Sequence, residues 1–129
     1  MTPELTILAL AGLLQFAQMA LYSVLANRQV PPGAAIGPRD TPITLIGRAG
    51  RAQRAMNNHF EGLILFTIAV LVLHLADKGT GLTATLAWIY LAARLLYVPA
   101  YLLGLAPWRS LIWMVGWLAS LLMLLMAFF

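Results

Sequence analysis

The stretch RAGRAQRAMNNHFEGLILF, residues 48–66, carries polar side chains directly into an apolar segment. On a helix with about 100° per residue, four of these polar residues fall on one face, within an arc of about 80°. They are Arg51, Arg54, Asn58 and Glu61. An ionised carboxylate facing lipid at the depth of Glu61 costs several kcal/mol, so we expect Glu61 to face protein and to pair with an arginine.

A second polar stripe follows in the third apolar segment, where residues spaced by 4, 3 and 4 place one guanidinium among three phenols. These residues are Tyr90, Arg94, Tyr97 and Tyr101. Arginine binds carboxylates with two hydrogen bonds, asparagine binds an amide edge, and glutamate binds an ammonium group. The two stripes together favour a small, zwitterionic, peptide-like ligand. A tripeptide thiol fits this description and would supply the sulfur that a chain without cysteine lacks.

Structural roles for the same residues stay open. Arginine side chains at helix ends often extend to the membrane surface, and tyrosine and tryptophan often lie at the interface. A purely structural ion pair between Arg94 and Glu61 is the main alternative to a ligand site. The two histidines, His59 and His74, have no cysteine or carboxylate partners at ligand spacing, so we expect no metal site.

The composition predicts the elements that hold these side chains. Of 129 residues, 62% are hydrophobic and 9% are charged, which is typical of a chain built from transmembrane helices. Each predicted span can cross about 30 Å of hydrocarbon at about 1.5 Å per residue. We therefore expect an all-α membrane protein, with residues 1–129 forming a single domain, a four-helix transmembrane bundle. The spans cover about residues 5–26, 50–76, 82–103 and 107–129.

Basic residues predict the orientation in the membrane. The first loop and the start of the second span contain five of the eight basic residues, against one acid, Asp40. By the positive-inside rule this loop and Arg109 lie in the cytoplasm, with both termini outside. The net charge of +4 forms no solvated basic patch, so nucleic acid is not an expected partner. The short chain without cysteine hints at a bacterial inner membrane.

The two polar stripes also match a known pair of sequence motifs. The first fits Arg-x-x-Arg-Ala-x-x-Asn-x-x-Glu, followed five residues later by phenylalanine, with matches at Arg51, Arg54, Ala55, Asn58, Glu61 and Phe66. The second, ARLLYVPAYLLGLAPWRSLIW, contains Arg94, Tyr97 and Tyr101 and continues to the pair Arg109-Ser110. In these motifs the chain resembles the MAPEG family, membrane-associated proteins in eicosanoid and glutathione metabolism. The resemblance covers essentially the whole chain, including the four spans and the long first loop.

The resemblance implies a homotrimer of four-helix bundles that binds glutathione as cosubstrate between neighbouring subunits, near the cytoplasmic side. One subunit would hold glutathione through Arg51, Arg54, Asn58 and Glu61. The next would complete the site through Arg94, Tyr97, Tyr101 and Arg109. By the same resemblance the catalytic pair would be Arg109, which stabilises the thiolate, and Ser110, which donates a hydrogen bond to the sulfur.

Three positions depart from the family pattern and leave the substrate open. Leu65 stands where eukaryotic members often have a proline before the phenylalanine, so the helix bend can differ. Trp113 stands where some members have a tyrosine, which removes a phenol near the sulfur. Asn57 stands where one prostaglandin-forming branch has an arginine.

These features lead to one main hypothesis and one alternative. The main hypothesis is a glutathione-dependent membrane transferase or peroxidase that acts on lipophilic electrophiles or lipid hydroperoxides entering from the bilayer. The alternative is a non-catalytic member of the same family that binds lipid or partner proteins. A small multidrug exporter is a third and less favoured hypothesis, because it needs an acid in the middle of the first span, where this chain has only Glu4 at the edge.

Overall fold

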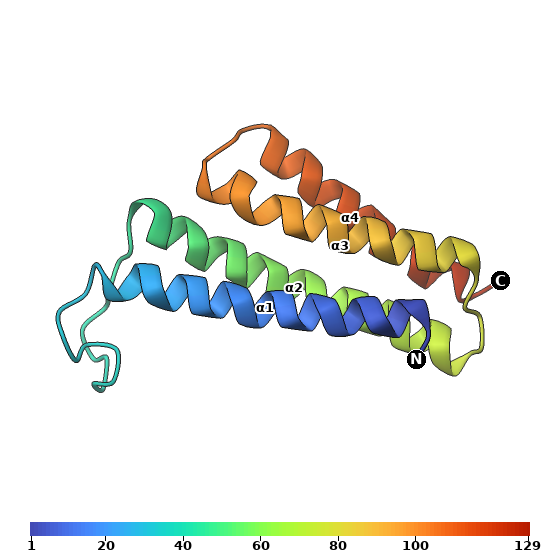
Figure 1. The fold of residues 1–129 in the computed structure, drawn as a ribbon, viewed down its shortest axis with the longest axis horizontal. Helices are drawn as coiled ribbons and strands as arrows, with labels where there is room; N and C mark the ends of the chain where they lie inside the picture. The colour runs from blue at the N-terminus through green and yellow to red at the C-terminus, as the bar shows by residue number, and fades with distance from the viewer.

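The computed structural model describes residues 1–129 and contains four long helices and no strand. The prediction of an all-helical chain with four apolar helices is confirmed. In Figure 1, α1 lies beside α2 and α3 beside α4, with both termini and the α2–α3 turn at one end and the α1–α2 loop and α3–α4 turn at the other. The helices are α1 (Pro3–Asn27), α2 (Gly47–Leu75), α3 (Gly81–Leu102) and α4 (Trp108–Met126).

Two threonines explain where helices begin at the end with the termini. Thr2 caps α1, since its side chain accepts a hydrogen bond from the Leu5 amide at 3.4 Å, and proline occupies the next position, where it costs no hydrogen bond. Thr80 caps α3 in a reciprocal arrangement with Thr83, each side chain accepting from the other's amide. These caps satisfy amides that lie at the membrane interface.

The first loop returns the chain to α2 through one side chain. Gln29 donates to the Ile46 carbonyl oxygen at 2.8 Å and accepts from the Ile46 amide at 3.0 Å. Four prolines keep the intervening residues out of a helix. The pair of hydrogen bonds therefore closes the loop directly before the turn of α2 that carries the first arginines.

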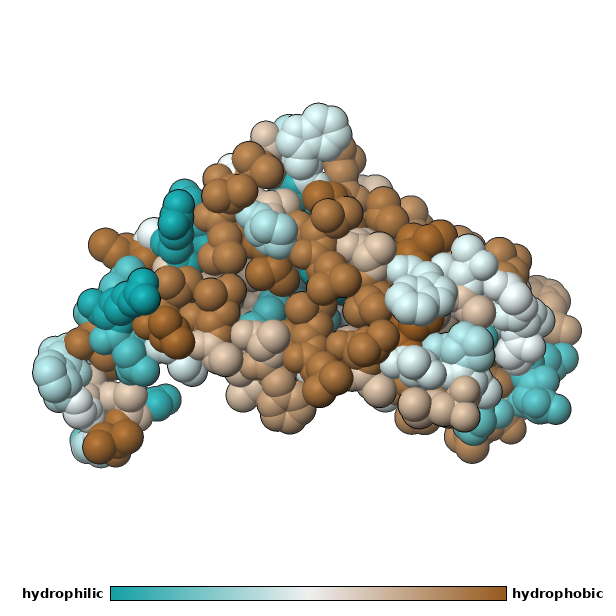
Figure 2. Space-filling view, viewed as in Figure 1, coloured by the Kyte–Doolittle hydropathy of each residue, from teal (hydrophilic) through white to brown (hydrophobic).

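Most large apolar side chains of the bundle point outward. Only 25 of the 129 residues are buried, and all four helices are long and apolar enough to cross a membrane. Figure 2 shows apolar surface along the helices, with hydrophilic residues gathered toward the two ends. In water so much exposed apolar surface would drive aggregation, so this distribution fits a lipid environment.

The apolar core fills mainly the half of the bundle near the termini. Phe66 of α2 stacks on Tyr90 of α3 with ring centroids 3.8 Å apart, and small alanines let the helices approach closely. The other half, toward the loop, holds the polar stripes. The core residues are Ile7, Ala11, Phe66, Ala69, Val70, Leu73, Ala87, Tyr90, Leu91, Ala119 and Met123.

Candidate ligand-binding site

Three guanidinium groups surround a cavity of about 240 Å³ at the loop end of the bundle. The start of α2 forms one wall, and the end of α3 with the connection to α4 forms the other. No carboxylate lines this arginine cavity, so its charge fits an anionic ligand. The lining residues are Arg51, Arg54, Tyr101, Gly104, Ala106 and Arg109.

Tyr101 of α3 organises two of the three arginines. Its hydroxyl accepts a hydrogen bond from Arg54 Nε at 3.2 Å, and its ring lies 4.6 Å from the Arg109 guanidinium carbon. Arg51 is held separately, by a 3.1 Å hydrogen bond from its guanidinium to the Leu102 carbonyl oxygen. Each arginine is oriented by one contact and keeps further N–H donors for a ligand.

Gly104 makes room for Arg51 in the α3–α4 connection. Its φ of +68° lies in the left-handed region, and a Cβ added there would lie 3.2 Å from the Arg51 guanidinium carbon. A larger residue would be strained by its backbone and would press on the arginine. The glycine is therefore part of the arginine cavity.

Arg94 lies deeper in the bundle and is buried, with 2% of its surface exposed. Its guanidinium donates to Asn58 Oδ1 at 3.0 Å and lies 5.3 and 5.8 Å from the ring centroids of Tyr90 and Tyr97. Its Nε is buried without a hydrogen-bond partner. A buried cation held by one neutral amide and two aromatic faces retains capacity to bind an anion.

Two glycines form the slot that admits Arg94. A Cβ added to Gly62 of α2 would overlap the guanidinium, and one added to Gly116 of α4 would lie 3.6 Å from Arg94 Nε. Neither glycine is predicted as a site residue from the sequence. Their signal is that glycine lowers the stability of a helix interior, so its presence there indicates a close approach of another group.

A family model for the MAPEG family matches residues 5–129. The chain belongs to the MAPEG family. Membership supports a membrane-bound function in glutathione or eicosanoid metabolism, and together with the four apolar helices it identifies an integral, multi-pass membrane protein. No individual curated protein matches the sequence.

This MAPEG chain brings most of the predicted site residues together within one subunit. The contacts Arg54–Tyr101 and Asn58–Arg94 join the two polar stripes, which the family resemblance places on neighbouring subunits. Tyr97 is buried and packs edge-on against Tyr101 with centroids 5.5 Å apart. The stripe on α3 is therefore turned into the bundle.

Two predicted residues lie outside this arrangement. Glu61 is exposed on α2 and makes no ion pair or hydrogen bond within the chain, so the expectation of an arginine partner is wrong for a single subunit. The partner of Arg94 is Asn58, because the guanidinium enters the slot beside Gly62. Ser110 is exposed on the first turn of α4 and does not line the arginine cavity.

His59 has a structural partner in α1. Its Nδ1 lies 2.7 Å from Gln15 Oε1, and the ring is buried between the two helices. No group of three histidine, cysteine or acidic residues in the chain could hold a metal ion. We therefore interpret His59 as a packing residue that ties α1 to α2.

Proposed function

We propose that this protein is a glutathione-dependent membrane transferase or peroxidase that acts on lipophilic electrophiles or lipid hydroperoxides. The observation that carries the proposal is the arginine cavity, with three guanidiniums and no carboxylate at one end of a membrane bundle. Glutathione has two carboxylates and one ammonium group, so its net negative charge fits this lining. Glutathione supplies the thiol that the cysteine-free chain lacks.

The predicted site residues, in the arginine cavity and deeper in the bundle, suit different parts of glutathione. Arg51 and Arg54 have free N–H donors for its carboxylates, since each is held by a single contact. The unpartnered Nε of Arg94, with Asn58 beside it, suits a carboxylate or amide oxygen deeper in the bundle. Glu61 would form an ion pair with the ammonium group, and Tyr97 and Tyr101 would position the arginines.

Arg109 is the residue that we assign to thiol activation. It lies on the first turn of α4, and its guanidinium reaches back over Tyr101 into the cavity. The positive end of the α4 dipole adds to its charge, and both favour a thiolate over a thiol. Ser110 follows directly, and we assign it as hydrogen-bond donor to the sulfur.

The proposed assembly is a homotrimer. Arg54 and Glu61 are exposed on the same face of α2, which is otherwise an apolar helix. Charged side chains facing lipid are costly, so a neighbouring subunit would cover them and complete the site. A stable monomer in mass measurements of the detergent-solubilised protein would contradict this assembly and remove any site between subunits.

The proposed orientation follows the arginines, with residues 1–129 acting as one four-helix unit. The α1–α2 loop and the arginine cavity would face the cytoplasm of a bacterial inner membrane, and both termini would lie outside. Glutathione would then enter from the cytoplasm, and the lipophilic substrate would enter from the bilayer. Accessibility labelling at the α1–α2 loop and at the termini in intact cells tests this orientation.

A non-catalytic scaffold that binds lipid or partner proteins is the second candidate. The observation that favours it is Ser110, which lies outside the arginine cavity. Calorimetric titration of glutathione into purified protein, with thiolate absorbance and conjugation of an aromatic electrophile, separates the two. Binding with a thiolate band and turnover supports the enzyme. Binding without a thiolate band, conjugation or peroxidase activity supports the scaffold, and no binding contradicts the glutathione site itself.

A further inference from the structure

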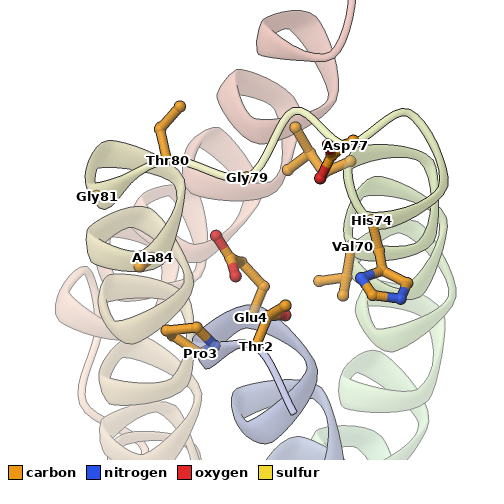
Figure 3. A pocket seen from close by; sticks show the side chains of 11 residues that line it. Thr2, Pro3, Glu4, Val70, His74, Asp77, Gly79, Thr80, Gly81 and Ala84 are labelled. Atoms are coloured by element: carbon orange, nitrogen blue, oxygen red, sulfur yellow. The ribbon is translucent and has the colours of Figure 1, made fainter.

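A second cavity, of about 330 Å³, lies at the end of the bundle opposite the arginine cavity. It forms where the start of α1, the last turn of α2 and the turn into α3 meet (Figure 3). Polar groups of Glu4, His74, Asp77 and Thr80 line it, and apolar side chains including Val70 lie one turn further into the bundle. We call it the acidic cavity, because two of its lining residues are carboxylates.

Glu4 is the buried group that faces this cavity. It is 5% exposed, and Figure 3 shows its carboxylate rising from α1 toward the turn at Gly79. Oε1 lies 2.6 Å from the Thr83 hydroxyl, which also lies 2.8 Å from the Thr80 carbonyl oxygen. The hydroxyl has one proton for these two acceptors, so the hydrogen bond to Glu4 is shared.

The remaining acceptor capacity of Glu4 is unused within the chain. Oε2 accepts no hydrogen bond within the chain, and it is not one of the fully buried polar atoms, so it is open to the cavity. The N-terminal ends of α1 and α3 both lie beside this carboxylate. A carboxylate oxygen that is open to the cavity and has no partner in the chain is a site for a donor from outside the chain.

No cation of the protein fills that place. Lys78, in the turn between α2 and α3, donates to the backbone carbonyl oxygen of Phe129 at 3.1 Å and does not line the acidic cavity. Met1, which precedes the lining residues, is 90% exposed. The cavity thus combines Glu4 and Asp77 with no positive side chain other than a titratable histidine.

We infer that the acidic cavity binds the primary ammonium group of a membrane lipid headgroup. A primary ammonium carries one positive charge and three N–H donors, for which the free oxygen of Glu4, the carboxylate of Asp77 and the hydroxyl of Thr2 are available as acceptors. A metal ion fits less well, because no three histidine or acidic residues come together there. This inference is independent of the glutathione site, which lies at the other end of the helices.

A lipid is the source of the ammonium group because of where the cavity lies. It opens among the ends of helices that are long and apolar enough to cross the bilayer, which is the depth of the headgroups. Its inner wall is apolar, with Val70 and Leu73 in the buried core and Ala84 partly exposed on α3. A headgroup at this depth can reach the cavity while its acyl chains stay in the membrane.

Native mass spectrometry of the detergent-solubilised protein tests the inference, using phosphatidylethanolamine and phosphatidylcholine as probes. The two headgroups have the same charge, but the trimethylammonium of phosphatidylcholine has no N–H donor. We expect phosphatidylethanolamine to bind at least about tenfold more tightly than phosphatidylcholine, because phosphatidylcholine cannot donate hydrogen bonds to the carboxylates of the cavity. Equal affinities would overturn the inference without any mutation.

Three variants locate the binding. Glu4→Gln keeps the shape but removes the charge. Gly79→Leu keeps the carboxylate but places a side chain in the cavity against it, since an added Cβ would lie 3.6 Å from Glu4 Oε1. Each should reduce the preference for phosphatidylethanolamine about tenfold. Asp40→Asn, in the loop at the opposite end, should leave it unchanged. An unchanged preference in a folded Glu4→Gln or Gly79→Leu protein would place the binding elsewhere.

Free ethanolamine separates a lipid from a soluble amine. If the lipid is the ligand, millimolar ethanolamine should displace little phosphatidylethanolamine, because the acyl chains stay in the surrounding apolar phase. Displacement at similar concentrations of the two ligands would overturn the lipid as the source of the ammonium group.

Discussion

The substitution Gly62→Ala should destabilise the bundle, because its Cβ would occupy the place of the Arg94 guanidinium. Arg94 is 2% exposed and its guanidinium lies against the rings of Tyr90 and Tyr97, so an added methyl group would displace it against these rings. Displacement would break its 3.0 Å hydrogen bond to Asn58. The change therefore affects the one buried cation of the bundle through a single methyl group.

The magnitude follows from three contributions. The lost hydrogen bond to a charged group costs about 1.5–3 kcal/mol, and forcing a methyl into a filled site costs about 1–3 kcal/mol. Replacing glycine by alanine within a helix returns about 0.5–1 kcal/mol. The expected loss is about 1.5–5.5 kcal/mol in the free energy of unfolding.

Unfolding in mixed micelles, followed by far-ultraviolet circular dichroism, measures this loss. Gly12→Ala is the matched control, since the place of its Cβ has no atom within 4 Å, and it should be neutral or slightly stabilising. In an Arg94→Ala background the penalty of Gly62→Ala should largely disappear, because the overlapping group is gone. A penalty below about 0.5 kcal/mol, or one of equal size with and without Arg94, would contradict the close packing of the Arg94 guanidinium against Gly62.

Three further predictions concern the loop end. Arg109→Ala should raise the pKa of the bound glutathione thiol, move the pH profile of conjugation to higher pH and lower the conjugation rate by about one or more orders of magnitude. Arg109→Lys should restore only part of the lost rate. Full activity in a folded Arg109→Ala protein would remove Arg109 from the mechanism. Glu61→Gln should weaken glutathione binding in calorimetry by about tenfold, and unchanged affinity in a folded protein would place Glu61 outside the site. Gln29→Ala removes the hydrogen bonds of 2.8 and 3.0 Å that close the α1–α2 loop. Proteolysis of this loop should therefore accelerate severalfold at constant helix content. An unchanged cleavage rate would contradict the role of Gln29 in closing the loop.

The helices could be predicted because apolar length is a property of the sequence alone. The ends of the helices could not be predicted in the same way, because hydropathy detects only apolar residues. A helix also includes polar turns, which its caps and tertiary contacts stabilise. The second helix begins at Gly47, before the predicted apolar span at about residue 50, and so also includes Arg48. The first begins at Pro3, where Thr2 provides the cap.

The candidate site was predictable as two helix faces but not as a set of contacts. Spacing places Asn58 and Glu61 on one face, but it does not say which of them meets Arg94 of another helix. What spacing does not give is the depth of each side chain in the bundle and how closely α2 and α3 approach each other. Gly62 decides the contact, because it allows the Arg94 guanidinium to lie against the α2 backbone. Arg94 therefore donates to Asn58, and Glu61 stays exposed without a hydrogen bond to it.

The arginines that predict the orientation are partly the same ones that line the cavity. Arg51, Arg54 and Arg109 count toward the positive-inside rule, and their guanidiniums surround the space at the loop end. At the other end, Glu4 and Asp77 line a cavity without a basic side chain other than a histidine. The two ends of the bundle thus differ in charge, and the difference bears on both insertion and binding. In the proposed orientation the arginines lie in the cytoplasm, so the arginine cavity would face cytoplasmic ligands and the acidic cavity would face the opposite leaflet.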